Sequence, residues 1–341
     1  MIHFDSDYTE GCIPEILEAL QKSNEEQTDG YGMDPHCEHA RELIRKAVGN
    51  EKADVHFLVG GTQANTTVIA ALLKPYQGVL CAETGHINCH ETGAVEASGH
   101  KVLGLPHKNG KITAAQVEEA IILHETDESY EHIVQPAMVY ISFPTEIGTL
   151  YSKAELKAMH AVCKAHHIPL FIDGARLGYG LASKKNDCTM KDICKYSDVF
   201  YIGGTKIGAL FGEAVVFSNL TLSKDFRYSI KQRGGMLAKG RLLGIQFETL
   251  FTDNRYMKIS KHAMACADEL TDALKKKNIP FLSEPETNQI FPILTNNKIK
   301  QLRRKFVFHT WGKVDATHTA VRFVTSFMTK EENLQELIKS L

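Results

Sequence analysis

The stretch that decides the fold reads Asp198-Val-Phe-Tyr-Ile-Gly-Gly-Thr-Lys-Ile-Gly-Ala209. Its β-branched and aromatic residues predict a strand over 198–202, and the two glycines that follow predict its end. Lys206 therefore leaves a strand end among small residues. A lysine that forms a Schiff base needs a lowered pKa and room beside it for a flat molecule, which small neighbours supply. A lone lysine after a strand is usually solvated, so this pattern needs support from elsewhere in the chain.

A second apolar run delivers charged residues to the same kind of position. In Pro169-Leu-Phe-Ile-Asp-Gly-Ala-Arg-Leu177, Asp173 and Arg176 stand at the carboxyl end of the run. Open α/β sheets build their sites at such strand ends. An aspartate there can accept a hydrogen bond from a protonated pyridine nitrogen, which keeps that ring able to absorb electrons. An ion pair between Asp173 and Arg176 is the structural alternative.

A third segment, Val55-His-Phe-Leu-Val-Gly-Gly-Thr-Gln-Ala-Asn65, joins a strand to a helix through two glycines. The start of a helix offers unpaired N–H groups to a phosphate, and glycines allow close approach. Gly61 and Thr62 are the candidate phosphate ligands, and Thr205 could add a hydroxyl. The segment has neither the GxGxxG spacing of dinucleotide binders nor the Lys-Ser/Thr of a P-loop. A tight structural turn is the alternative.

Short β-branched runs alternate with helical patterns through most of the chain. This alternation predicts an α/β fold with a mostly parallel seven-stranded sheet covered on both faces by helices. The predicted strands are Val55–Val59, Gly78–Cys81, Lys101–Leu105, Ala137–Ser142, Pro169–Asp173, Asp198–Ile202 and Ala214–Phe217.

The pattern changes after about residue 250. A long charged helix is predicted over 259–277, with strand-like pieces at 289–295 and 320–325. Thr329 and Glu332 have the spacing of a capping box for a final helix.

Length and composition bound the remaining possibilities. A chain of 341 residues exceeds one average domain, so we expect an N-terminal arm and large domain over 1–250 and a small α+β domain over 251–341. The net charge of −2 gives no field for nucleic acid. No run is apolar enough for a membrane span or a secretion signal, and the eight scattered cysteines indicate reduced thiols. We expect a cytoplasmic protein.

Motifs along nearly the whole chain fit one family. They are Ser6-Asp7, Gly30-Tyr-Gly-x-Asp-Pro35, Gly61-Thr-Gln-Ala-Asn65, His86, Glu91-x-Gly-Ala94, Asp173-Gly-Ala-Arg-Leu177 and Gly204-Thr-Lys206. With them, the chain resembles the low-specificity L-threonine aldolase group of fold-type I pyridoxal 5′-phosphate (PLP) enzymes, also grouped with β-eliminating lyases. The resemblance implies a large domain like that of aspartate aminotransferase and a homodimer or homotetramer.

The resemblance also implies catalytic residues. Lys206 would carry the cofactor as a Schiff base, and Asp173 would hold the ring nitrogen. His86 would stack on the ring near the substrate hydroxyl, where an imidazole can cover the ring and still accept a proton. Glu91 is a further candidate acid or base.

Binding residues follow from the same resemblance. Ser6, Arg176 and Arg322 match positions that hold the substrate carboxylate, for which a planar guanidinium is suited. Arg176 is also counted with the cofactor site, and Arg233 would approach the phosphate from a neighbouring subunit. From the sequence alone, Arg322 could instead be a charge on the outer face of its strand.

Two observations leave alternatives open. The run His86-Ile-Asn-Cys-His-Glu91 could suggest a metal, but it lacks helical His-Glu-x-x-His spacing and a second cluster, so we predict no metal. Family members often carry Asn-Thr-His-Asn in a loop that here reads Ser142-Phe-Pro-Thr-Glu-Ile-Gly-Thr149, with Thr145 or Glu146 near the place of the histidine.

The implied activity is retro-aldol cleavage of a small amino acid, L-threonine or L-allo-threonine, to glycine and an aldehyde. The altered loop keeps two relatives of this reaction open, namely β-elimination and cleavage of a bulkier β-hydroxy amino acid. A non-catalytic PLP-fold binding protein is a more distant alternative.

Overall fold

Seven strands form the central sheet of the computed structural model, which describes residues 1–341. Only β8 runs antiparallel to its neighbours. The predicted seven-stranded, mostly parallel sheet is therefore confirmed. In spatial order the strands are β2 (Asp54–Leu58), β8 (Glu213–Phe217), β7 (Val199–Gly203), β6 (Leu170–Asp173), β5 (Gln135–Ser142), β3 (Gln77–Ala82) and β4 (Lys101–Leu105).

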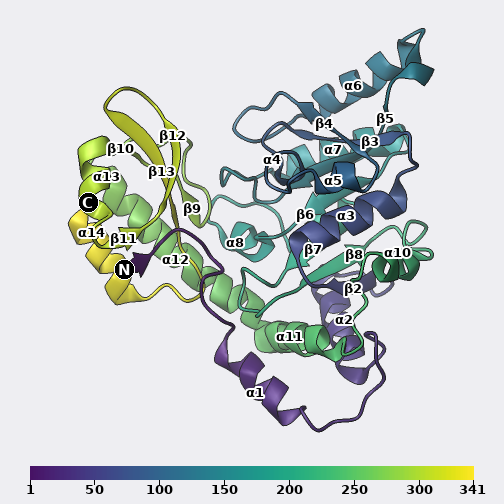
Figure 1. Ribbon diagram of the computed structural model, residues 1–341, viewed down its shortest axis with the longest axis horizontal. Coiled ribbons are helices and arrows are strands. Elements are labelled where there is room, and N and C mark those ends of the chain that lie inside the picture. Colours follow the sequence, from purple (N-terminus) through teal and green to yellow (C-terminus); the bar gives the residue numbers. More distant parts are fainter.

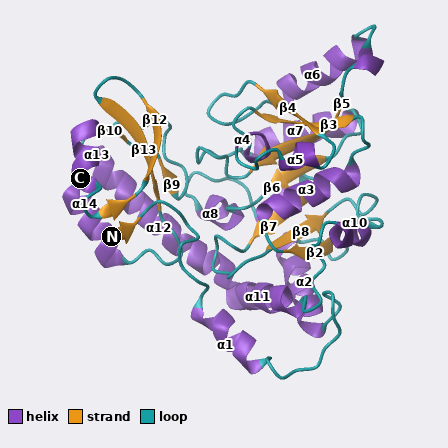
Figure 2. Ribbon diagram, viewed as in Figure 1, coloured by secondary structure: helices purple, strands orange, loops and turns teal.

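Helices cover both faces of this sheet (Figures 1 and 2). Alternate residues of one strand enter different cores: in β7, Phe200 packs on one face and Tyr201 on the other, as the strand period of two requires. One face packs against α2 (Pro35–Val48), α6 (Ala114–Thr126), α7 (Lys153–Ala165), α8 (Leu177–Ala182), α9 (Met190–Lys195) and α11 (Arg241–Phe251), and the other against α3 (Gly61–Leu72), α4 (His86–Cys89), α5 (Ala94–Ala97) and α10 (Phe226–Gln232).

The start of α2 shows how local sequence fixes an element. The Asp34 side chain accepts a hydrogen bond from the backbone N–H of Cys37 at 2.9 Å, and Pro35 occupies the first helical position. Both features favour helix initiation. The helix therefore begins at Pro35.

A smaller lobe packs beside the sheet, with the long helix α12 (Arg255–Lys276) running between the two (Figure 1). In the sheet of the smaller lobe, one strand, β13 (His318–Val324), pairs with three others, which are β9 (Gln289–Ile290), β10 (Ile293–Thr295) and β12 (His309–Lys313). The remaining elements of this lobe are α13 (Asn296–Leu302), β11 (Phe306–Val307) and α14 (Glu331–Ser340).

The N-terminal arm begins in this smaller lobe. Strand β1 (Ile2–His3) pairs in parallel with β11, and helix α1 (Pro14–Lys22) follows on the side of the large lobe. The first residues of the chain therefore belong to the same lobe as residues after 251. The predicted boundary between a large domain over 1–250 and a small domain over 251–341 stays a proposal. None of the helices combines the length and apolar character needed to cross a membrane.

The capping box predicted at Thr329 and Glu332 is wrong. Helix α14 begins after Lys330, whose side chain makes no capping bond. The Thr329 hydroxyl instead accepts a hydrogen bond from the backbone N–H of Ser326 at 2.8 Å. The hydroxyl stabilises the turn before the helix and is no longer available to the helix itself.

Candidate active site

The three predicted segments meet at one edge of the large sheet. Strands β6 and β7 are parallel neighbours, so Asp173 and the turn that carries Lys206 lie at the same edge. The start of α3 faces them across a cavity of about 320 Å³. Predicted residues that line this cavity are Gly61, Thr62, His86, Asp173, Arg176, Thr205 and Lys206.

Asp173 is a buried carboxylate surrounded by donors. The Tyr140 hydroxyl donates to its Oδ2 at 2.6 Å, and Asn65 Nδ2 donates to the same oxygen at 3.2 Å. Burial opposes ionisation, but the charge of His86 and the hydroxyls of Tyr140 and Tyr201 hold the pKa of Asp173 below its usual value. The carboxylate therefore stays charged, as a partner for a protonated ring nitrogen requires.

His86 is fixed by a carboxylate behind it. Its Nδ1 lies 2.8 Å from Oε1 of Glu91, whose side chain is fully buried. Because a carboxylate can only accept, Nδ1 carries the hydrogen and Nε2 keeps a free lone pair. Burial lowers the pKa of His86, but Glu91 and Asp173 outweigh it, so the pKa is raised overall.

The thiol of Cys89, from the run considered as a metal site, makes no hydrogen bond to His86. Cys89 Sγ donates to the backbone carbonyl of Glu83 at 2.9 Å. No group of three or more His, Cys, Asp or Glu side chains in the chain is arranged to hold a metal ion.

Lys206 has the properties of a nucleophilic amine. Burial and the charge of Arg176 lower its pKa, which favours the neutral amine that attacks a carbonyl carbon. The Tyr179 hydroxyl donates to the Lys206 carbonyl at 2.5 Å and fixes the backbone. The ring of Tyr8, 5.9 Å from Lys206 Nζ, is a neighbour that the sequence did not indicate.

The glycines before Lys206 have a different purpose from the one expected. A Cβ on Gly203 would lie 2.3 Å from the carbonyl oxygen of Ala175, and one on Gly204 would lie 2.7 Å from that of Gly212. These glycines are required because neighbouring backbone packs directly against them. They do not serve mainly to make room beside the lysine.

Arg176 pairs with the N-terminal arm. Its Nε and Nη2 donate to the two carboxylate oxygens of Asp7 at 2.6 and 3.0 Å, and Asn288 Nδ2 also donates to Asp7. The alternative of an Asp173–Arg176 ion pair is therefore wrong. Since Asp7 uses Nε and Nη2, Nη1 is the nitrogen left for a ligand.

Arg322 and Ser6 hold buried donors without partners. Arg322 is half-buried, and its Nη2 donates to the backbone carbonyl of Asp5 at 3.1 Å. It therefore faces the N-terminal arm, and the outer-face alternative is wrong. Arg322 Nε and Ser6 Oγ are both buried without a hydrogen-bond partner. Such unpaired donors are costly unless a ligand satisfies them.

Two further carboxyl groups line the cavity without having been assigned roles. Glu146 Oε1 accepts hydrogen bonds from the His86 backbone N–H at 2.9 Å and from Ser142 Oγ at 2.5 Å, and burial raises the pKa of Glu146. Glu213 Oε1 is hydrogen-bonded to Thr205 Oγ1 at 2.9 Å. The altered loop was a signal for Glu146, whereas a carboxyl beside a predicted phosphate site had no signal in the sequence.

Arg233 lies outside the cavity within one chain. It follows α10, and its backbone carbonyl accepts a hydrogen bond from Gln63 Nε2 at 3.3 Å. Its predicted role toward a neighbouring subunit stays a prediction.

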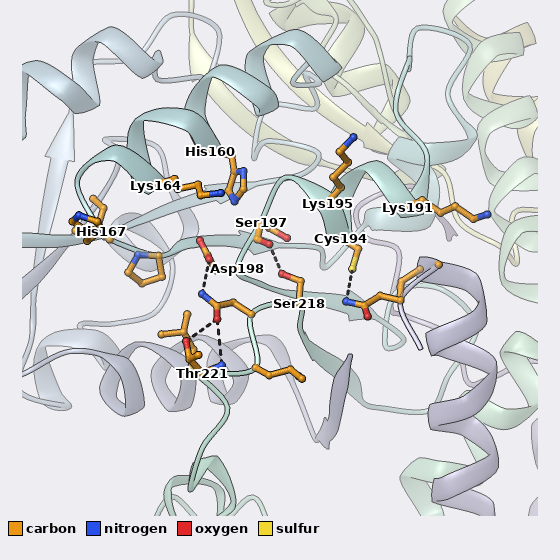
Figure 3. A pocket seen from close by; sticks show the side chains of 18 residues that line it. His160, Lys164, His167, Lys191, Cys194, Lys195, Ser197, Asp198, Ser218 and Thr221 are labelled. Carbon is orange, nitrogen blue, oxygen red and sulfur yellow. Dashed lines mark hydrogen bonds between the residues drawn. The ribbon is translucent and has the colours of Figure 1, made fainter. Parts of the chain in front are cut away.

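A larger hollow of about 920 Å³ lies at the opposite edge of the sheet, where β6 and β7 begin (Figure 3). Exposed lysines such as Lys164 and Lys195 border it. Its one carboxylate, Asp198, already bonds Asn219 at 3.0 Å. It also holds Cys194, His160 and His167, but no hydrogen bond joins the cysteine to either histidine. The smaller cavity, where the three predicted segments meet, is therefore the candidate site.

Comparison with known proteins places this arrangement in context. Residues 3–297 match the model of a family described as β-eliminating lyase. A low specificity L-threonine aldolase from a Pseudomonas species is 32% identical over 341 residues, which cover 98% of this chain and 95% of that protein. The structure of a threonine aldolase from Leishmania major is 41% identical, with a TM-score of 0.96 over 99% of this chain and 98% of that one.

A more distant structure defines the fold class. Aspartate aminotransferase from Thermus thermophilus is 13% identical, with a TM-score of 0.71 over 100% of this chain and 90% of that one. The expected aspartate-aminotransferase-like fold is thus confirmed.

Proposed function

The chain belongs to the β-eliminating lyase family, and we propose that it is a PLP-dependent aldolase that cleaves L-threonine or L-allo-threonine to glycine and acetaldehyde. One observation carries the proposal: Lys206, Asp173 and His86 line a single cavity. They are a nucleophilic amine, a charged carboxylate and a flat base, and the reaction needs one of each.

The residues present fit PLP. Lys206 would hold its aldehyde carbon, Asp173 its ring nitrogen, and Gly61, Thr62 and Thr205 its phosphate. A Cβ on Gly60 would meet nothing within 4 Å, so the turn before α3 is open toward the cavity. The first N–H groups of α3 have no partner within the helix and can bind an anion. When bound, PLP supplies an electron sink for the pair of electrons released at Cα.

The substrate carboxylate would be held by Ser6, Arg176 and Arg322. Support for this assignment comes from the unpaired Ser6 Oγ and Arg322 Nε, and from the Arg176 nitrogen that Asp7 leaves free. Three donors converging on one carboxylate would fix rotation about the bond to Cα. That rotation decides which bond at Cα breaks.

His86 is the proposed acceptor of the β-hydroxyl proton. Its Nε2 is free because Glu91 occupies Nδ1, and the raised pKa makes it a stronger base. As the Cα–Cβ bond breaks, the hydroxyl oxygen becomes the carbonyl oxygen of acetaldehyde and its proton passes to His86. Glycine is completed by a proton delivered to Cα.

A second candidate is cleavage of a bulkier β-hydroxy amino acid or β-elimination. The observation that favours it is Glu146, a carboxyl lining the cavity near the place where family members often carry a histidine. The products separate the candidates, since β-elimination releases ammonia and a keto acid, whereas an aldolase releases glycine and an aldehyde.

We also propose a homodimer or homotetramer in the cytoplasm. Exposed aromatic side chains beside α10, the helix that precedes Arg233, support an interface: Tyr228 is 78% exposed and Tyr31 47%, and both line one surface hollow. Exposed apolar side chains that gather in one patch mark interaction sites. The eight free cysteines support a reducing compartment. A monomeric mass in solution with full activity would contradict the role of Arg233.

The deciding experiment measures acetaldehyde release from L-threonine and L-allo-threonine by the PLP-loaded protein, coupled to an NADH-dependent reductase. We expect release that disappears in Lys206→Ala. A protein that binds PLP through Lys206 but releases acetaldehyde from neither isomer would overturn the threonine assignment.

A further inference from the structure

Glu213 is a buried carboxyl that the proposed mechanism does not use. It opens β8, is 4% exposed, and is paired in register with Leu58 of β2 and Gly203 of β7. The chain after Leu58 forms the Gly60-Gly61 turn, and the chain after Gly203 leads to Thr205. The carboxyl therefore lies between the two segments proposed to hold a phosphate, and it lines the same cavity.

The hydrogen bonds around Thr205 restrict what its hydroxyl can do. Thr205 Oγ1 accepts the N–H of Gly212 at 3.0 Å and lies 2.9 Å from Glu213 Oε1. Glu213 Oε2 accepts the N–H of Gly204 at 3.2 Å. A hydroxyl has one hydrogen and two lone pairs, and Gly212 takes one lone pair.

Two arrangements remain, and they have opposite consequences. If Glu213 is ionised, it takes the hydroxyl hydrogen, and Thr205 has no hydrogen left for a phosphate. If Glu213 carries a proton on Oε1, it donates to the second lone pair, and the Thr205 hydrogen is free to point into the cavity. Only the protonated carboxyl makes Thr205 a phosphate donor.

The surroundings favour the neutral carboxyl. The ionisable groups that face Glu213 are Lys206, Asp173, Tyr201 and Tyr256. Burial, joined by the charge of Asp173, raises the pKa of Glu213 to about 8, against the opposing effects of Lys206 and of the hydrogen bonds with Thr205 and Gly204. A phosphate dianion in the cavity would repel an ionised carboxylate and favour the proton further.

We propose that Glu213 is protonated in the cofactor-bound protein and donates to Thr205, so that binding of a phosphate group is coupled to a proton on Glu213. The inference rests on the proposed function only for the identity of the phosphate ligand. By linkage, affinity for the phosphate falls by up to about tenfold per pH unit once Glu213 ionises in the empty site.

The test compares PLP with pyridoxal, which has the same aldehyde and ring but no phosphate. Equilibrium dialysis of the apoprotein against each compound, at about pH 7 and about pH 9, gives the affinity for PLP divided by the affinity for pyridoxal at each pH. A phosphate monoester is already dianionic over this range because its second pKa is about 6. We expect the ratio to fall about tenfold at the higher pH. An unchanged ratio overturns the inference, and no substitution is needed to obtain it.

Matched variants locate the effect. Glu213→Gln can accept from Gly204 and donate to Thr205 without titrating, so we expect PLP affinity within about threefold of wild type at pH 7 and a ratio that no longer changes with pH. Thr205→Val should weaken PLP, but not pyridoxal, by about tenfold through loss of one charge-assisted hydrogen bond. If Glu213→Gln weakens PLP at neutral pH as much as Thr205→Val, the carboxyl acts in its ionised form and the inference is wrong.

These measurements use no amino-acid substrate. A protein with the expected pH-dependent PLP affinity but no acetaldehyde release would overturn the proposed aldolase activity and leave the assignment of Glu213 intact.

Discussion

Nδ1 of His86 and Oε1 of Glu91 lie 2.8 Å apart, and the same Glu91 oxygen accepts a hydrogen bond from Asn65 Nδ2 at 2.7 Å. Asn65 in turn reaches Asp173. One amide thus links the carboxylate behind the proposed base to the carboxylate behind the proposed cofactor. Of the two carboxylates that raise the pKa of His86, Asp173 lines the cavity and Glu91 does not.

Replacing Glu91 by Gln should weaken that base. Gln can still accept the Nδ1 hydrogen, but the loss of negative charge lowers the pKa of His86. His86 must be neutral to accept a proton, so the acid limb of the profile of kcat/KM against pH should move to lower pH. The plateau should fall by about 10–100-fold because a weaker base transfers the proton more slowly. An acid limb that does not move contradicts this role, and exposed Glu96→Gln is the control.

Removing the partner of Arg176 should destabilise the protein. Asp7→Ala leaves a buried guanidinium without its carboxylate, which costs about 3–5 kcal/mol in the free energy of unfolding. Urea denaturation measures this loss. Asp5→Ala is the matched control, because the contact of Asp5 with the exposed His3 is worth less than about 1 kcal/mol. Equal effects of the two substitutions would show that the buried pair has no special importance.

Glu146 should position His86 by accepting a hydrogen bond from the backbone N–H of His86. Glu146→Ala removes the acceptor of the His86 N–H, and we expect kcat/KM for aldehyde release to fall about tenfold. Gln keeps an acceptor oxygen and should restore activity to within about threefold. Failure of Gln to restore it, with a changed profile against pH, would show that the carboxyl itself transfers a proton.

Arg322→Lys should affect substrate binding and leave PLP affinity unchanged. Lysine loses the planar fork that meets a carboxylate with two hydrogen bonds, so KM should rise about tenfold or more. The only tryptophan, Trp311, has its ring 5.6 Å from Arg322 Cζ. Its fluorescence should therefore change when glycine binds to the wild type, and less in the variant. If Arg322→Lys lowered PLP affinity as much as it raised KM, Arg322 would contact the cofactor and not the substrate.

The sequence predicted the strands well because their ends coincide with local signals. Gly203 and Gly204 end β7 where glycines were expected to end it, and the Pro169 run gives β6 to within one residue. These signals need only near neighbours. The cavity residues Asp173 and Lys206 follow from them, since strand ends at one edge of a parallel sheet must meet. His86 was predicted only from the resemblance to the family.

Contacts between distant segments could not be predicted in this way. Asp7 and Arg176 are 169 residues apart in the sequence, so the sequence suggested the nearer Asp173 as the partner instead. Even the nearer pair of Thr205 and Glu213, eight positions apart, depends on β8 running antiparallel beside β7, a direction that the sequence did not predict. At Thr329 the local pattern itself was misleading, because the Thr329 hydroxyl accepts the backbone N–H of Ser326 in the preceding turn and does not cap the helix.

The pairing of β1 with β11 has a consequence for synthesis of the chain. The Phe4 backbone bonds Val307 and Val324, and these two bonds hold the arm that carries Ser6 and Asp7. A ribosome produces these partners last, so the first segment to emerge has nothing to pair with until translation is nearly complete. Most of the large sheet is therefore synthesised, and can fold, before Ser6 and Asp7 are held beside Arg176.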